Sequence, residues 1–250
     1  MMRRLLIIFT VLLLTCALAL ADARSGFDEG LRLYRNNDMD GAIAAWEHVV
    51  QQGDVSGPLY YNLGNAYYRA KKYGMAILYY ERARKLLPRD HDITSNLDLA
   101  RMATVDKIEP TVRLVVWNWV DSVRDHYNVH ELASMFYVLG LFCAMALLMF
   151  RYGPSGLRRI FKTLTALLLV AYILSGSWYL WRATLEGRRY GVVMETKTDA
   201  YSAPDDASKQ LFSLHEGTKV QFGESLSGWV NVRLADGRKG WIPVQSLEKI

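Results

Sequence analysis

Few residues in this chain have the types and the spacing that catalysis would need. Among the five histidines, only His126 and His130 lie four positions apart, and no glutamate stands between them as it does in a zinc-binding catalytic helix. The two cysteines, Cys16 and Cys143, both fall inside apolar runs, so the polar parts of the chain contain no thiol for a disulfide, a metal or nucleophilic catalysis. The signatures of serine hydrolases and of nucleotide-binding loops are also missing from the sequence. We therefore expect no catalytic residues, no metal site and no cofactor.

The composition indicates what kind of protein this is instead. Apolar residues make up 51% and charged residues 22% of the 250 residues. This apolar share is high for a fully soluble protein. The excess is concentrated in three runs, residues 5–20, 132–150 and 164–180. The formal net charge is +5, but several cations flank these runs and no basic stripe interleaved with aromatic residues occurs. The sequence therefore predicts membrane segments and no nucleic-acid binding.

The first apolar run is typical of a secretory signal peptide. Arg3 and Arg4 precede the run, and Ala19 and Ala21 supply the small residues of a cleavage site, which predicts a signal peptide over residues 1–21. An uncleaved anchor helix is the alternative, because the run is near the upper length for a signal peptide. Both interpretations predict that the residues that follow are exported.

The other two apolar runs predict a transmembrane hairpin over residues 131–182. Each run is uncharged and is long enough to cross about 30 Å of hydrocarbon. The loop between them, 151–163, carries cations without acids, so the positive-inside rule places it in the cytoplasm. Neither run contains a charged side chain on which an ion pathway would depend. We therefore predict a membrane anchor that leaves both flanking regions outside the cytoplasm.

The region before the hairpin contains a repeat with an offset of 34 positions. The matched residues are Gly30 with Gly64, Ala42 with Ala76, Ile43 with Ile77, Trp46 with Tyr80, and Asn62-Leu63 with Asn96-Leu97. The small residues let two antiparallel helices approach closely, while the bulky residues interlock. The segment 57–90 resembles the tetratricopeptide repeat (TPR) family at Tyr60, Leu63, Gly64, Tyr67, Ala76, Tyr80, Ala83 and Pro88. The resemblance implies an all-α TPR module over residues 22–106, in which residues 92–105 form a closing helix.

Stacked TPR helix pairs form a concave groove, in which TPR proteins bind peptides or segments of partners. The resemblance places five residues of the second repeat in this groove: Tyr61, Asn62, Asn65, Tyr68 and Arg69. The alternative for each residue is an ordinary solvated helix face. Asn62 and Asn65 also occupy positions at which some TPR domains clamp a C-terminal carboxylate. Asp92 and Asn96 stand where such clamps carry cations, which argues against that ligand.

Residues 107–130 connect the helical module to the hairpin. Valines and Trp119 recur there at the three-and-four spacing of an amphipathic helix. With Trp117 beside it, this helix is predicted to lie on the membrane surface, and packing against the TPR stack is the alternative. Both arrangements keep the groove near the bilayer, which predicts a membrane-bound partner.

From residue 188 the pattern changes to short β-rich runs separated by turn residues. These runs are 190–196, 219–222, 229–234 and 240–243, and Asp236-Gly237 is a hairpin signal between the last two. Together with segments 200–204, 214–218 and 237–242, they resemble the bacterial SH3 domain, which implies an all-β SH3-like barrel over residues 188–250. The candidate ligand-binding residues are Tyr201, Trp229 and Trp241, and the two tryptophans are equally good candidates for the barrel core.

The order of these segments, with residues 104–110 as the linker, resembles the BatE family of aerotolerance operons over nearly the whole chain. The expected fold class is thus multi-domain: an all-α TPR helical-repeat module, an α-helical transmembrane hairpin and an all-β SH3-like barrel. The resemblance implies a complex with membrane proteins that carry von Willebrand A domains, a MoxR-type ATPase and other Bat-operon products. It also implies a place in the bacterial inner membrane, with both modules on the periplasmic side, and a link to envelope or oxidative stress.

Three functional hypotheses follow. The first is an adaptor that assembles this membrane complex through its TPR groove. The second is a cell-wall sensor whose SH3-like domain binds peptidoglycan. The third is an enzyme, for which the sequence offers no residues.

Overall fold

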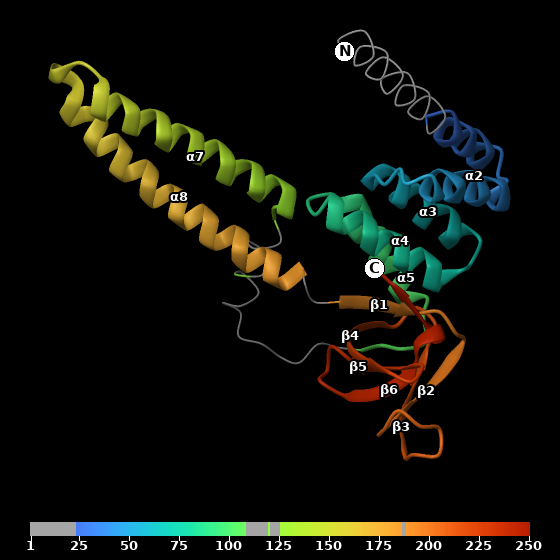
Figure 1. The fold of residues 1–250 in the computed structure, drawn as a ribbon. Helices are drawn as coiled ribbons and strands as arrows, with labels where there is room; N and C mark the ends of the chain where they lie inside the picture. The colour runs from blue at the N-terminus through green and yellow to red at the C-terminus, as the bar shows by residue number, and fades with distance from the viewer. Residues whose placement is uncertain (1–23, 109–119, 121–125, 187–188) are drawn as a thin grey trace, which may run out of the picture. The chain divides into compact units, whose positions relative to one another are not determined.

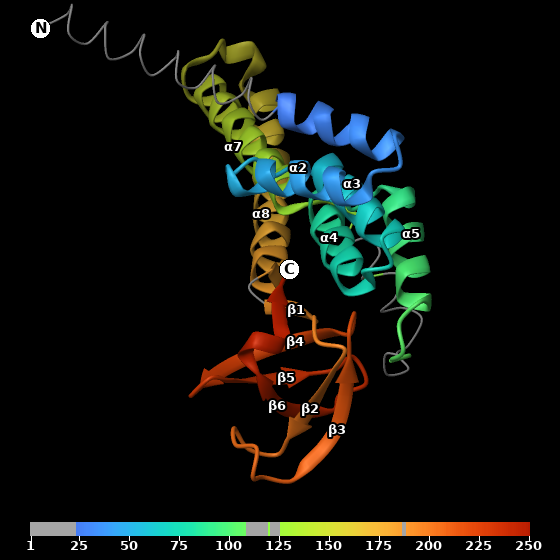
Figure 2. The ribbon, with the colours of Figure 1, turned by 90° about the vertical axis from the view of Figure 1, so that its right-hand side faces the viewer.

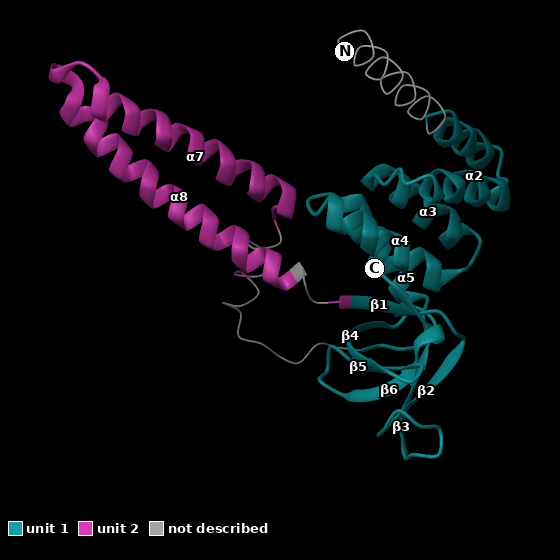
Figure 3. Cartoon of the chain, in the orientation of Figure 1, with its two compact units in different colours: residues 1–110, 190–250 teal, residues 111–189 magenta. Residues whose placement is uncertain are grey.

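The structure, a computed structural model, describes residues 24–108, 120, 126–186 and 189–250. Their contacts divide the chain into two compact units, one of residues 1–110 and 190–250 and one of residues 111–189 (Figure 3). The expected signal peptide, and most of the expected amphipathic connector (109–119 and 121–125), lie outside the described residues. The domain boundaries stay predictions, but the first unit contains both the helical module and the strands, a relation that the sequence did not predict.

The N-terminal part of the first unit is a stack of antiparallel helices (Figure 1). Residues 24–35 are helical, and α2 (Met39–Gln51), α3 (Gly57–Arg69), α4 (Tyr73–Leu86) and α5 (His91–Met102) follow. Three of these helices begin with a side-chain cap that accepts hydrogen bonds from the first turn: Asp38, Ser56 and Asp90. Helix α4 has no such cap, because its N-cap residue is a lysine that accepts no hydrogen bond.

The packing within the stack follows the repeat. A Cβ atom on Gly30 would lie 2.2 Å from the Trp46 ring, and one on Gly64 would lie 2.5 Å from the Tyr80 ring. Glycine at these positions therefore lets the aromatic residue of the second helix lie directly against the backbone of the first. Trp46 and Tyr80 are almost completely buried as a result.

The C-terminal part of the first unit is an antiparallel sheet. Its strands are β1 (Arg189–Val193), β2 (Lys197–Tyr201), β3 (Gln210–His215), β4 (Lys219–Leu226), β5 (Trp229–Arg233), β6 (Lys239–Pro243) and β7 (Leu247–Lys249). The strand order is β3-β2-β6-β5-β4-β1-β7. The hairpin turn between β5 and β6 contains Gly237 at a φ of +95°, and Val232 pairs with Gly240 beyond it. The predicted turn at Asp236-Gly237 therefore positions this hairpin as expected.

The sheet differs from the sequence prediction in two respects. Strands β2, β3 and β7 were not among the predicted β-rich runs. Strands β2 (Lys197–Tyr201) and β7 (Leu247–Lys249) are short and mainly polar, whereas in β3 the alternation of Phe212 and Leu214 with polar residues was overlooked. The strand order has β3 and β7 at its ends, and no pairing joins these two strands in the part of the chain that the structure describes. An antiparallel SH3-type sheet is therefore observed, and its closure into a barrel stays a prediction.

The second unit is a hairpin of two long helices, α7 (Val129–Tyr152) and α8 (Arg158–Glu186) (Figure 1). The stretches Val129–Tyr152 and Ser155–Leu185 have mean hydropathies of 2.2 and 1.7 and are long enough to cross a membrane. Phe136 stacks on Tyr172 with ring centroids 4.4 Å apart, and a Cβ on Gly176 would lie 2.8 Å from the Phe136 ring. The length and composition of the two helices suggest membrane association.

The turn of the hairpin is shorter than the predicted loop of residues 151–163. Helix α7 continues to Tyr152, and α8 begins at Arg158, so Arg158, Arg159 and Lys162 belong to α8 rather than to a loop. Gly153 and Pro154 interrupt the helix, a 3-10 turn follows at Ser155–Leu157, and no glycine or proline occurs over residues 157–175, so the chain returns to helix at Arg158.

Candidate functional site

A hollow of about 100 Å³ opens on the side of the helical stack that carries most of the predicted groove residues, which we call the groove side. It is lined by Tyr34, Asn65, Tyr68, Arg69, Tyr80, Asn96 and Leu99. These residues come from the first helix, α3, α4 and α5, so that each helix pair of the stack contributes to the lining. Its chemistry is mixed, with phenol rings, two amides, one guanidinium and one apolar side chain.

A hydrogen-bond network holds the polar lining in place. The Tyr80 hydroxyl donates to Asn65 Oδ1 at 2.7 Å, and Asn96 Nδ2 donates to the same oxygen at 2.9 Å and to the Tyr61 hydroxyl at 3.1 Å. Burial raises the pKa of the Tyr80 phenol, so its hydroxyl stays protonated and keeps its role as a donor. The orientation of the Asn65 amide therefore depends on residues from α4 and α5 together.

Arg69 provides the positive charge at the edge of the hollow. Its guanidinium lies 4.8 Å from the centroid of the Tyr34 ring and donates to Asn37 Oδ1 at 2.6 Å. A cation stacked on an aromatic ring keeps its charge available to an anionic group. The edge of the hollow can therefore attract a carboxylate.

Of the five groove residues predicted from the sequence, the structure brings three into the lining of the hollow: Asn65, Tyr68 and Arg69. Tyr61 supports the lining through its hydrogen bond with Asn96 and its ring contact with Tyr80, whose centroid is 6.1 Å away. Asn62 is half-buried on α3 but does not line the hollow. Whether any of the five binds a ligand stays a prediction.

Three lining residues were missed: Tyr34, Tyr80 and Leu99. Asn96 had been considered only as a clamp position, and it lines the hollow as well. The 34-residue offset relates Tyr68 to Tyr34 and Asn65 to Leu99, so extending the repeat from the second copy to its neighbours would have identified two of them. Tyr80 gave no such signal. It matches Trp46 in the first copy of the repeat, and a bulky residue that recurs at the same position indicates core packing rather than a groove.

The three aromatic candidates in the sheet lie close together. The Tyr201 and Trp229 rings are in edge contact with centroids 5.5 Å apart, and Tyr201 pairs with Trp241 across β2 and β6. All three are half-buried, so each has an exposed part as well as a packed part. Leu226, the cross-strand partner of Trp229, is 51% exposed and extends this aromatic patch.

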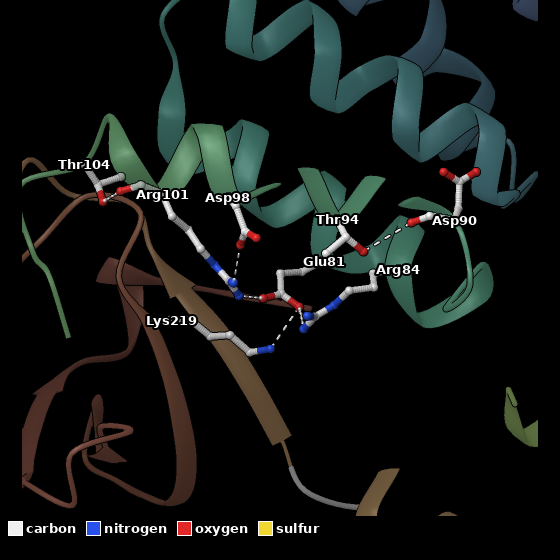
Figure 4. Close-up of polar contacts among 8 residues, drawn as sticks. All are labelled: Glu81, Arg84, Asp90, Thr94, Asp98, Arg101, Thr104 and Lys219. Atoms are coloured by element: carbon white, nitrogen blue, oxygen red, sulfur yellow. Dashed lines mark hydrogen bonds and ion pairs between the residues drawn. The ribbon is translucent and has the colours of Figure 1, made fainter. Parts of the chain in front are cut away.

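The sheet also packs against the helical stack around a buried carboxylate (Figure 4). Glu81 on α4 is 1% exposed and forms ion pairs with Arg84 and Arg101 at 2.7 Å each and with Lys219 of β4 at 2.9 Å. Burial alone opposes ionisation of this carboxyl, but the three surrounding cations outweigh it and hold the pKa of Glu81 at about 2. Glu81 therefore stays charged at any physiological pH.

Further contacts extend this interface to the start of α4 and to strand β7. Glu216, in the turn between β3 and β4, accepts a hydrogen bond from the Gly74 backbone N–H at 2.8 Å. Arg82 donates to Glu248 at 3.2 Å and to the Lys249 carbonyl oxygen. Apolar packing accompanies these polar contacts, because Val192 is buried in the core cluster of the helical stack and Met194 and Ile250 pack against that cluster.

Asp106, just after α5, joins the end of the stack to the same turn of the sheet. Its carboxylate accepts hydrogen bonds from the His215 backbone N–H at 2.8 Å and from the Thr218 hydroxyl at 2.6 Å, and it contacts His215 Nδ1 at 2.8 Å. Burial works against its charge, but these hydrogen bonds lower the pKa of Asp106 below its usual value. The sheet therefore lies against the α4 and α5 side of the stack, as both ribbon views show (Figure 1 and Figure 2).

Comparisons with known families agree with the two folds. Residues 58–90 match the tetratricopeptide repeat family, and residues 195–249 match the bacterial SH3 domain family. The chain thus contains a TPR repeat and a bacterial SH3 domain, which we call the SH3 module. The comparison with curated proteins gives no significant match, and the resemblance to the BatE family is not confirmed.

Proposed function

We propose that this protein is a non-enzymatic, membrane-anchored adaptor that binds protein partners through its TPR groove. The observation that carries the proposal is the hollow on the groove side of the stack, whose lining comes from successive helix pairs. TPR repeats are modules of protein–protein interaction, and their concave surfaces bind extended or helical segments.

The chemistry of the hollow supports a peptide ligand. Asparagine amides and tyrosine hydroxyls can both donate and accept hydrogen bonds, as a peptide backbone requires. The hydrogen bonds among Tyr80, Asn65 and Asn96 orient these groups before a ligand arrives, which reduces the entropy lost on binding. Arg69 at the edge favours a segment with an acidic residue at the corresponding position.

The long apolar hairpin supports the anchoring part of the proposal. Arg151, Arg158, Arg159 and Lys162 gather at the turn between α7 and α8. The positive-inside rule would place this turn in the cytoplasm and hence the TPR stack and the SH3 module on the periplasmic side of a bacterial inner membrane. The partners we propose are membrane proteins with von Willebrand A domains and other Bat-operon products, in a BatE-like complex that serves envelope or oxidative stress.

Photocrosslinking in intact cells tests this function. Leu99 lines the hollow and is 46% exposed, so a photoreactive residue there replaces an apolar side chain without removing a hydrogen bond. The matched control carries the same residue at Asp54, an exposed position between α2 and α3. We expect capture of a von Willebrand A-domain protein from position 99 only. Equal capture from both positions, or no capture from position 99, would contradict the adaptor.

A cell-wall sensor is the second candidate, and the half-buried Tyr201–Trp229 pair with the exposed Leu226 favours it. Aromatic rings that are packed on one side and exposed on the other suit carbohydrate or peptide ligands. The test is binding of the full chain to purified peptidoglycan. Binding that Tyr201→Ala abolishes, and that a control Tyr152→Ala in the hairpin leaves unchanged, would support the sensor.

A further inference from the structure

Two polar groups of helix α4, the Gly74 N–H and the Glu81 carboxylate, have partners in the SH3 module. The first N–H groups of a helix have no partner within the helix, and a side-chain cap usually supplies one. Helix α4 has neither a side-chain cap nor an acidic residue in its first turn. Glu216 of the SH3 module accepts from the Gly74 N–H in that turn, 142 positions away in the sequence. This carboxylate also lies at the end of the helix where a negative charge is favourable.

The contacts of α4 with the SH3 module extend along the whole helix. Gly74 contacts Glu216 in the first turn, a Cβ on Gly217 would lie 2.9 Å from Ile77 in the second turn, and Glu81 pairs with Lys219 two turns from the start. Further along the helix, Arg82 donates to the Glu248 side chain and to the Lys249 carbonyl oxygen of β7. One side of α4 therefore lies against the SH3 module over most of its length.

The same helices line the hollow with their other side. Tyr80, which donates to Asn65 in the groove, is the neighbour in sequence of Glu81, which pairs with Lys219. On α5, Asn96 donates to Asn65, while Arg101 pairs with Glu81 at the interface. A shift of α4 or α5 on one side must therefore move hydrogen-bonding groups on the other.

We propose that docking of the SH3 module holds α4 and α5 in the positions that shape the hollow, so that docking and ligand binding in the groove are thermodynamically coupled. A ligand that needs this arrangement of helices strengthens docking, and docking strengthens ligand binding by the same factor. The ligand rests on the proposed function, but the effect of docking on the groove helices can be measured without any ligand.

Hydrogen exchange of the full chain in detergent tests the coupling. The variant Glu216→Ala removes the cap of α4, and Glu224→Ala removes an exposed carboxylate of β4 as the matched control. We expect amide exchange to become roughly fivefold faster in α4 for Glu216→Ala, the scale of losing a helix N-cap. We also expect faster exchange in α3 (Gly57–Arg69), whose hydrogen bonds to Tyr80 and Asn96 carry the effect to the groove. Faster exchange in α4 with α3 unchanged would overturn the proposal.

Exchanging the charges of Arg82 and Glu248 distinguishes a loss of docking from a loss of folding. Arg82→Glu and Glu248→Arg each place like charges together across the interface, so each single variant should speed exchange in α3 and α5. The double variant restores opposite charges but not the hydrogen bond of Arg82 with the Lys249 carbonyl oxygen, so it should recover part of the protection. Exchange in β5 and β6 must stay slow in all three chains, which shows that the SH3 module remains folded. Loss of protection that the double variant does not recover would overturn the coupling, whether or not a groove partner is ever captured.

Discussion

The two sides of helices α4 and α5 use polar side chains in opposite ways. On the side of the SH3 module, the carboxylate of Glu81 is buried and paired with three partly exposed cations. On the groove side, the lining is mainly amides and phenols, and its one cation, Arg69, is exposed at the edge. Removing a neutral polar group from water costs less free energy than removing a charged group.

This difference separates a lasting contact from a reversible one. A buried carboxylate that loses its cations while it stays buried is strongly destabilised, so the closed interface must keep Glu81 and its cations together. Such a cluster suits two modules that remain together within one chain. A lining of amides and hydroxyls can exchange water for a peptide at a small net change in free energy, which suits a site that binds and releases a partner. The predictions below test each side separately.

The largest expected effect comes from Glu81→Ala. This change leaves the cations Arg84, Arg101 and Lys219 without their shared carboxylate. Breaking a fully buried ion pair costs about 3–5 kcal/mol, and because water reaches these partly exposed cations we expect a loss near the lower end of that range. Thermal unfolding of the full chain in detergent, followed by tryptophan fluorescence, should show a clearly lower midpoint. Glu29→Ala removes an exposed carboxylate that pairs only along its own helix, and it should leave the midpoint nearly unchanged. Similar midpoints for the two variants would mean that the ion cluster does not hold the modules together.

A fall in pH should weaken the same contact. The pKa of Glu81 lies at about 2, below its ordinary value of 4.5, so its charge stabilises the folded chain fully above pH 4.5. That stability is lost as the pH falls from about 4.5 to 2, and by linkage it is on the order of 3 kcal/mol.

The measurement is the unfolding midpoint against pH for the unchanged chain and for Glu81→Gln. The difference between the two chains should shrink as the pH falls through this window. A difference that is the same at pH 6 and at pH 3 would show that the charge of Glu81 contributes nothing.

On the groove side, Gly64→Val should have a smaller effect. A Cβ atom there would lie 2.5 Å from the Tyr80 ring, and overpacking of a core costs about 1–3 kcal/mol. The displaced Tyr80 hydroxyl would also move away from Asn65, so crosslinking from position 99 should fall. Gly223→Val is the control, because nothing lies within 4 Å of a Cβ at that position. Unchanged stability and capture in Gly64→Val would refute the close packing of these helices.

The smallest effect on stability should come from Asn96→Ala. The side chain loses two hydrogen bonds, to Tyr61 and Asn65, and because the site is half-buried we expect a loss of about 1 kcal/mol. Capture of a partner from position 99 should nevertheless fall strongly, since the Asn65 amide loses its orientation. Ser95→Ala, on the exposed face of α5, serves as the control. A capture yield equal to that of the control would remove the amide network from the binding site.

Local patterns in the sequence predicted the elements well where the pattern repeats along a helix or marks a tight turn. Gly30 and Gly64 predicted close helix packing, because the repeat places a bulky aromatic residue, Trp46 or Tyr80, at the same distance after each glycine. Asp236-Gly237 predicted the β5–β6 hairpin for a similarly local reason. The lining of the hollow was predicted in part: Asn65, Tyr68 and Arg69 belong to it, while Tyr34 and Leu99 required the repeat to be extended to the neighbouring copies.

The interface between the modules gave no local signal. Glu81 in its own helix has the pattern of an ordinary charged residue, and only the folded chain surrounds it with cations, one of them 138 positions away. The missing cap of α4 could have been noticed in the sequence, but nothing nearby identified Glu216 as the group that replaces it.

The sequence by itself thus determined that the chain contains TPR helices, long apolar helices and SH3-type strands, since each of these depends on a repeat, a run or a turn within one continuous segment. Only the tertiary structure decided that the helical stack and the SH3 module form one unit, with a buried carboxylate between them. The physical reason is that the free energy of a buried charge depends on which groups surround it in space. One of those groups, Lys219, comes from a segment that the entire hairpin separates from Glu81 in the sequence.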